Sequence, residues 1–232
     1  MRVHHPASER FHTAIDWLDS WHSFSFGEHS DPKRMRFRAL RVINDDRIAG
    51  GGGFGTHGHR DMEILTWVLN GAVHHRDSTG GEGDIRPGEL QQMTAGRGIR
   101  HSEFNASPTV PLRLLQIWLQ PTVTGLPPGY AQTAFPAAGR EGRLQLIAAQ
   151  DGRDGALKVA TGADVYATTL RAGGHVEHAL HPGRHAWIQV ACGTVTANGI
   201  TMVEGDGLAV SDESAVTLAT EGDAEVVLFD LA

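Results

Sequence analysis

Two short clusters of imidazole and carboxylate side chains stand out in the first half of the chain. The first contains His57 and His59, separated by one glycine, and the second contains His101 and Glu103, separated by one serine. Residues i and i+2 of a β-strand point to the same face, so each cluster can present two metal ligands side by side from one strand. Brought together, the two strands would supply three imidazoles and one carboxylate.

This donor set predicts a site for one divalent transition metal ion. Imidazole and carboxylate together suit Fe(II), Mn(II), Co(II), Ni(II) or Cu(II), and zinc accepts the same donors. Four protein ligands on an octahedral ion leave two open positions, enough for a bidentate substrate or for a substrate and dioxygen. Glu63 has two roles open to it: a further ligand, or a carboxylate that fixes the tautomer of a ligand imidazole.

Simpler interpretations of these residues carry less weight. One His-x-His is common on protein surfaces, and a His-x-Glu can be a local ion pair, but two such clusters bounded by glycines and strand-like runs favour metal binding. A second histidine group lies between two glycine-containing turns, and we interpret it as exposed loop residues without a catalytic metal: His175, His178, His181 and His185.

Composition narrows the class of protein. The chain has 232 residues and a net charge of -7, which argues against direct nucleic-acid binding or an acidic membrane surface. No apolar run is long enough for a membrane span, and the first residues do not resemble a secretory signal. The single Cys192 excludes an internal disulfide, and its apolar neighbours predict a buried thiol. We therefore expect a cytoplasmic location.

Short apolar runs separated by glycine and proline predict an all-β fold. Asn44 to Asp46 is typical of a turn, and the Asn-Gly pairs at 70–71 and 198–199 predict β-hairpins. The expected strands cover 38–43, 62–69, 72–76, 90–94 and 112–119 in the first half, and 143–149, 157–159, 165–170, 186–190, 195–197 and 226–229 in the second. Trp67, Met93 and Trp118 are expected to be core residues rather than pocket walls.

The domain organisation follows from a change in composition. Residues 123–142 are rich in proline, glycine and alanine, which predicts a linker. We therefore expect an N-terminal domain at 1–122 that carries the metal site, and a C-terminal domain at 143–232 without a catalytic metal. Residues 1–36 mix polar residues with aromatics, and we expect them to form an arm that packs on the body.

Longer motifs resemble a known family. Glycines placed before and after the two clusters are similar to the paired motifs of the cupin superfamily. The match is closer to the pirin family in 54–63 (Phe-Gly-Thr-His-Gly-His-Arg-Asp-Met-Glu) and in 98–103 (Gly-Ile-Arg-His-Ser-Glu). Further segments at 17–24, 40–46 and 154–159 also resemble bacterial pirins, so the resemblance covers nearly the whole chain.

The resemblance implies a bicupin, with two jelly-roll β-barrels packed in tandem and one iron in the first. It assigns His57, His59, His101 and Glu103 as the ligands, which leaves Glu63 for a supporting role beside them. Bacterial pirins are associated with quercetin 2,3-dioxygenase activity, which implies a flavonol and O2 as substrates. Glu103 would then be the catalytic base for the flavonol hydroxyl.

A different function is also open, because mammalian pirin is a nuclear transcriptional cofactor. By that analogy, the chain would be an iron-binding, redox-responsive regulatory protein that binds a protein partner and performs no turnover. Its acidic balance and lack of a DNA-binding motif weaken this alternative.

Overall fold

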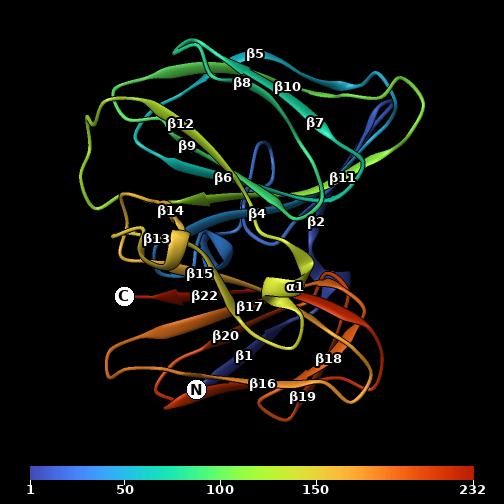
Figure 1. Cartoon of the computed structure of the whole chain (residues 1–232), viewed down its shortest axis with the longest axis vertical. Helices are drawn as coiled ribbons and strands as arrows, with labels where there is room; N and C mark the ends of the chain where they lie inside the picture. Colours follow the sequence, from blue (N-terminus) through green and yellow to red (C-terminus); the bar gives the residue numbers. More distant parts are fainter.

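The computed structural model describes residues 1–232, which form two β-sandwiches stacked along the long axis of the molecule (Figure 1). The predicted all-β bicupin fold is confirmed. Helical structure is limited to α1 (Ala137–Arg140) and three 3-10 turns, η1 (Ala7–Glu9), η2 (Pro32–Arg34) and η3 (Arg153–Gly155). None of these helical segments has the length and apolar character that a membrane-spanning helix requires.

The first sandwich consists of a seven-stranded and a four-stranded antiparallel sheet. In spatial order, the larger sheet contains β12 (Gly129–Ala134), β9 (Glu89–Thr94), β6 (Glu63–Asn70), β11 (Leu112–Leu119), β4 (Leu40–Ile48), β3 (Leu18–His22) and β2 (Phe11–Ile15). The smaller sheet contains β5 (Gly53–His59), β10 (Ile99–Asn105), β7 (Val73–Asp77) and β8 (Glu82–Ile85). Both predicted ligand clusters therefore lie in the smaller sheet, on neighbouring strands.

The second sandwich has the same division into seven and four strands. Its larger sheet contains β1 (Arg2–His5), β20 (Gly207–Val210), β17 (His185–Cys192), β22 (Ala224–Leu231), β15 (Asp164–Leu170), β13 (Gln145–Ala149) and β14 (Leu157–Lys158). The smaller one contains β16 (His175–Ala179), β21 (Ala215–Ala219), β18 (Thr194–Ala197) and β19 (Ile200–Val203).

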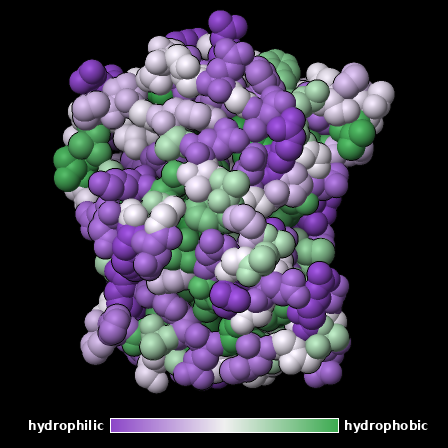
Figure 2. All heavy atoms as spheres, viewed as in Figure 1, coloured by the Kyte–Doolittle hydropathy of each residue, from purple (hydrophilic) through white to green (hydrophobic).

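The two seven-stranded sheets pack face to face in the middle of the molecule (Figure 1). A core of 23 buried apolar residues draws on both, with Leu65 and Trp67 of β6 on one side and Trp187 and Phe229 on the other. Hydrophilic residues cover most of the face in Figure 2, and several hydrophobic residues lie in the middle of this face, where the two halves meet. Burial on this scale fixes the two sandwiches against each other.

Most predicted strands of both halves are confirmed within about two residues at each end. The predicted turn at residues 44–46 is wrong, because these residues continue β4 between β3 and β11. Asn70 and Gly71 do not form a hairpin either, since β6 and β7 belong to different sheets. The hairpin at Asn198 and Gly199 is confirmed: both residues have positive φ, and they join the paired strands β18 and β19.

The chain crosses the expected domain boundaries twice. β1 of the N-terminal arm pairs with β20 in the sheet of the second half. Residues 123–142, expected as a linker, contain β12, which pairs with β9 and completes the first large sheet. The division at 1–122 and 143–232 remains our proposal for the two structural units. We add β12 to the first unit and assign β1 to the second.

Two expectations about the second half need correction. His175 and His178 lie in β16 and His185 begins β17, so these residues are not in a loop. His178 contacts the Asp230 carboxylate at 2.8 Å, and the side chain of His185 is buried. Cys192 is exposed rather than buried, and it is the last residue of β17.

Candidate metal centre

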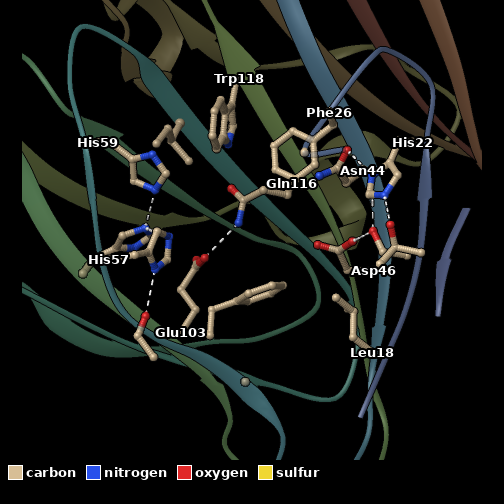
Figure 3. A pocket seen from close by; sticks show the side chains of 18 of the residues that line it. Leu18, His22, Phe26, Asn44, Asp46, His57, His59, Glu103, Gln116 and Trp118 are labelled. Atoms are coloured by element: carbon tan, nitrogen blue, oxygen red, sulfur yellow. Dashed lines mark hydrogen bonds between the residues drawn. The ribbon is translucent and has the colours of Figure 1, made fainter. Parts of the chain in front are cut away.

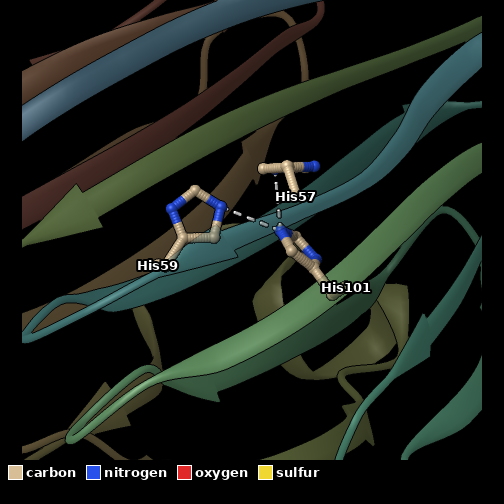
Figure 4. Close-up of side chains that lie close together, drawn as sticks. All are labelled: His57, His59 and His101. Atoms are coloured by element: carbon tan, nitrogen blue, oxygen red, sulfur yellow. Dashed lines mark hydrogen bonds between the residues drawn. The ribbon is translucent and has the colours of Figure 1, made fainter.

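Three imidazoles meet between β5 and β10. His57 lies directly opposite His101 in the strand register, and His59 lies on the same face of β5 as His57. The Nε2 atom of His101 is 2.9 Å from Nε2 of His59 and 3.1 Å from Nε2 of His57. Figure 4 shows the three rings pointing toward one another from the two strands. The structure therefore brings these three predicted residues together.

The spacing of these nitrogens suits a bound metal ion. Metal–imidazole bonds of about 2.1 Å at right angles place two nitrogens about 3.0 Å apart, close to the two distances seen here. All three ligand atoms lie within 4.8 Å of one another. The donor set therefore fits a transition metal without rearrangement of the strands.

Burial keeps two of these imidazoles, His59 and His101, in the neutral form that binds metals. Burial, reinforced by the neighbouring His101 and His57, lowers the pKa of His59 to about 4. Burial and the neighbouring His57 and His75 lower the pKa of His101 to about 3. At neutral pH both rings therefore offer a lone pair rather than a positive charge.

Glu103 is held in place by a row of polar residues on the opposite sheet. Its Oε2 accepts a hydrogen bond from Nε2 of Gln116 at 2.9 Å, and its Oε1 accepts from Thr66 at 3.2 Å and Gln91 at 3.3 Å. Thr66 pairs with Gln116 on one side and with Gln91 on the other in the strand register, so the three donors form one line across the sheet. Figure 3 shows Glu103 reaching from β10 toward Gln116.

A further histidine joins the site from β7. His75 is buried, and its ligand atom lies within 4.8 Å of those of His101 and Glu103. Its Nε2 contacts Oδ2 of Asp77 at 3.0 Å, and its ring stacks on Tyr130 with the centroids 4.6 Å apart. Sequence reasoning missed this residue, although its alternation with Val73 in the predicted strand 72–76 indicated an inward direction.

Glu63 does not support the imidazoles, so that expectation is wrong. It shares the face of β6 with Leu65 and points toward the second half of the molecule. Its Oε2 accepts hydrogen bonds from Gln92 at 2.7 Å and Thr94 at 3.0 Å. Burial raises the pKa of Glu63, as expected of a carboxyl group without a cation nearby. The carboxylate of Asp61 is structural and accepts the backbone N–H of Gly125 at 2.7 Å.

The imidazoles and Glu103 open into a cavity of about 620 Å³ inside the first sandwich. Trp118 lines it, with its ring 4.9 Å from that of His59, and Phe26 meets Trp118 edge to face at 5.4 Å. The expectation that Trp118 is plain core is therefore wrong, whereas Trp67 and Met93 are fully buried core residues. A second polar group lines the wall across from the histidines: Ser20, His22, Asn44 and Asp46 (Figure 3).

A bicupin with three imidazoles facing an aromatic cavity belongs to the metal-binding cupins. Comparison with known proteins narrows this class: the family model Pirin matches residues 4–119, and the model Quercetinase C-terminal cupin domain matches residues 146–231. The chain belongs to the pirin family.

Individual relatives agree with this assignment. The chain is 49% identical over 225 residues to the quercetin 2,3-dioxygenase of Escherichia coli K12, covering 97% of this chain and 96% of that protein. It is 43% identical to a putative quercetin 2,3-dioxygenase of Pseudomonas aeruginosa, over 95% of each chain. The bacterial pirin YhhW from Escherichia coli in complex with nickel(II) has a TM-score of 0.94 and 48% identity, covering 100% of this chain and 99% of that one.

Proposed function

We propose that this protein is a metal-dependent dioxygenase that opens the ring of a flavonol such as quercetin with O2. The observation that carries the proposal is the cavity of about 620 Å³, onto which the three imidazoles, Glu103 and the aromatic walls all open. Its volume falls within the range of roughly 300–1,000 Å³ that is common for small-molecule sites. The names of the bacterial relatives support the same reaction.

The proposed metal ligands are His57, His59, His101 and Glu103. The resident ion is proposed to be Fe(II), and the nickel complex of a related pirin supports a divalent transition metal in this position. When bound, the ion would act as a Lewis acid and as a template for the substrate and O2. His75 is less suited to a ligand role, because it does not line the cavity and already contacts Asp77.

The protein groups around the cavity would bind the flavonol and move its proton. Glu103 is the proposed base for the substrate hydroxyl, since its carboxylate lies at the cavity with its oxygens aligned by Gln116, Gln91 and Thr66. Trp118 and Phe26 offer apolar surfaces to a flat ring system.

The proposed enzyme has small-molecule partners and a cytoplasmic location. Its partners would be a flavonol and O2, with no direct binding of nucleic acid, because the chain is acidic at -7. A cytoplasmic location fits the single cysteine, which needs no oxidising compartment.

Metal analysis combined with gas measurements would test this function. Protein loaded with Fe(II) under anaerobic conditions should consume O2 when quercetin is added, and should release carbon monoxide in equal amount. His101→Ala should abolish both, while Asp19→Asn, an exposed carboxyl on β3, should retain them. Metal-dependent capture of a protein partner, with no turnover of any flavonol, would instead favour the regulatory alternative.

A further inference from the structure

The polar group across the cavity from the histidines is built on two neighbouring strands. Ser20 and His22 lie on β3, and they pair in register with Asp46 and Asn44 of β4. All four side chains are buried, and all four line the cavity. Two residues further along the same strands the pairing is apolar, with Leu18 opposite Ile48. The polar group is therefore a local departure from an apolar wall.

Folding does not account for this group. Asp45, the neighbour of Asp46, is equally buried but forms ion pairs with Arg113 at 2.9 Å and Arg10 at 3.4 Å. Asp46 has no cation within ion-pair distance, and its one hydrogen bond joins Oδ1 to the Ser20 hydroxyl. A buried carboxyl group without an ion partner destabilises a fold, so an apolar residue would serve better here if packing were the only requirement.

Two polar atoms of the group have no hydrogen-bond partner within the protein. Oδ2 of Asp46 is one of them, because the Ser20 hydroxyl donates to Oδ1. The Asn44 amide oxygen accepts a hydrogen bond from Nδ1 of His22 at 2.8 Å, which leaves the Nδ2 donor unused. His22 itself is fixed, because its Nε2 contacts the Thr13 hydroxyl at 3.0 Å. The two residues lie two apart on one strand and face the cavity together (Figure 3).

We infer that Asp46 and Asn44 form a subsite for a phenolic hydroxyl on a substrate ring that lies away from the metal ligands. A phenol both donates and accepts a hydrogen bond, so it can pair with Oδ2 of Asp46, whether that carboxyl is ionised or protonated, and with the unused Nδ2 donor of Asn44. Gln116 and Phe26 lie between this subsite and the imidazoles (Figure 3). A flat, polyhydroxylated substrate would extend from the imidazoles to this subsite. This inference rests on the proposed function.

Binding of two flavonols would test the subsite. Quercetin carries hydroxyls on its outer rings, whereas 3-hydroxyflavone keeps only the metal-binding hydroxyl and carbonyl. Isothermal titration under anaerobic conditions, on nickel-loaded protein, should give a quercetin preference that falls about tenfold in Asp46→Leu, the effect of one lost hydrogen bond. Asn44→Leu should reduce the preference in the same direction, and provides a second variant if the first does not fold.

Asp19→Asn, on the same strand pair but outside the cavity, is the matched control and should keep the full preference. Nickel stoichiometry measured on each variant shows whether the metal site is intact. Tight binding of both flavonols with the same preference in wild type, Asp46→Leu and Asn44→Leu would overturn the subsite alone. If neither flavonol binds the wild-type protein, the proposed function and the subsite both fail.

Discussion

Replacing Asp46 by Asn should remove a pH dependence of stability that this carboxyl imposes. Burial, together with the negative charges of Asp45 and Glu103 and against the hydrogen bond from Ser20, raises the pKa of Asp46 from 3.8 to about 7. Between these two pH values the folded protein retains a proton that the unfolded chain has lost. The folded state is therefore favoured at low pH and loses that advantage as the pH rises.

The magnitude follows from the size of the shift. About three pKa units at 1.36 kcal/mol each correspond to about 4 kcal/mol, lost between roughly pH 4 and pH 7. Asn stays neutral throughout and mimics the protonated carboxyl. The free energy of unfolding of Asp46→Asn, relative to wild type, should therefore increase by about 2–3 kcal/mol between pH 5 and pH 8.

Urea unfolding of metal-free protein at several pH values would measure this difference. The comparison with wild type is needed because burial lowers the pKa of His22 and His59, and these groups make the absolute stability fall below their ordinary pKa. Asp19→Asn is the control and should show a difference that does not vary with pH. A flat difference for Asp46→Asn as well would mean that Asp46 ionises near its ordinary pKa, and the reasoning about its burial would be refuted.

Four further predictions concern the metal. Alanine at His57, His59, His101 or Glu103 should weaken Co(II) binding by at least about 10–100-fold in titration calorimetry. Glu63→Gln should weaken it less, and a larger effect of Glu63→Gln than of the Glu103 variant would contradict the proposed ligand set. Gln116→Leu should also weaken binding, by roughly tenfold, because Glu103 loses the donor at 2.9 Å. Metal at a hundred- to thousandfold excess over its Kd should stabilise the fold by about 3–4 kcal/mol, measured as a rise in Tm, and identical curves would argue against a preformed site. Elemental analysis after dialysis should find one tightly held ion per chain, and a second ion lost in His175→Ala would disprove this.

The convergence of the imidazoles could be predicted from the sequence because it depends on local geometry. Strand alternation alone puts His57 beside His59, and His101 beside Glu103, on one face each. Once β5 and β10 pair, His57, His59 and His101 approach one another. A register shift after His101 places Glu103 opposite Phe54, and its carboxylate groups with His101 and His75. The strands could be predicted for the same reason, since apolar runs of four to eight residues bounded by turns are a local signal.

The remaining features depend on contacts that local sequence does not record. Asn44 and Asp46 have the composition of a turn, but pairing with both β3 and β11 keeps them in a strand. Glu63 lies six residues from His57, yet the alternation of β6 points it to the opposite side of the sheet. His75 became part of the site because β7 pairs with β10 and places it opposite Glu103. Trp118 became part of it because the larger sheet packs on the smaller one.

A comparison of the two sandwiches gives a physical reason for the proposed single metal site. The interior of the second holds a cluster of 16 buried apolar residues that includes Ile188, Val226 and Leu228. The proposed site in the first lies beside the buried polar residues Thr66, Gln91 and Gln116.

The second sandwich can nevertheless support the site from outside. On β6, Leu65 and Trp67 belong to the core shared with the second half, and the Trp67 indole donates a hydrogen bond to Glu225 at 2.8 Å. Thr66, between them, faces the other way and donates to Glu103. The contact between the two halves thus fixes the strand from which Thr66 reaches Glu103, so the packing of the second half helps to position the Glu103 carboxylate of the first half.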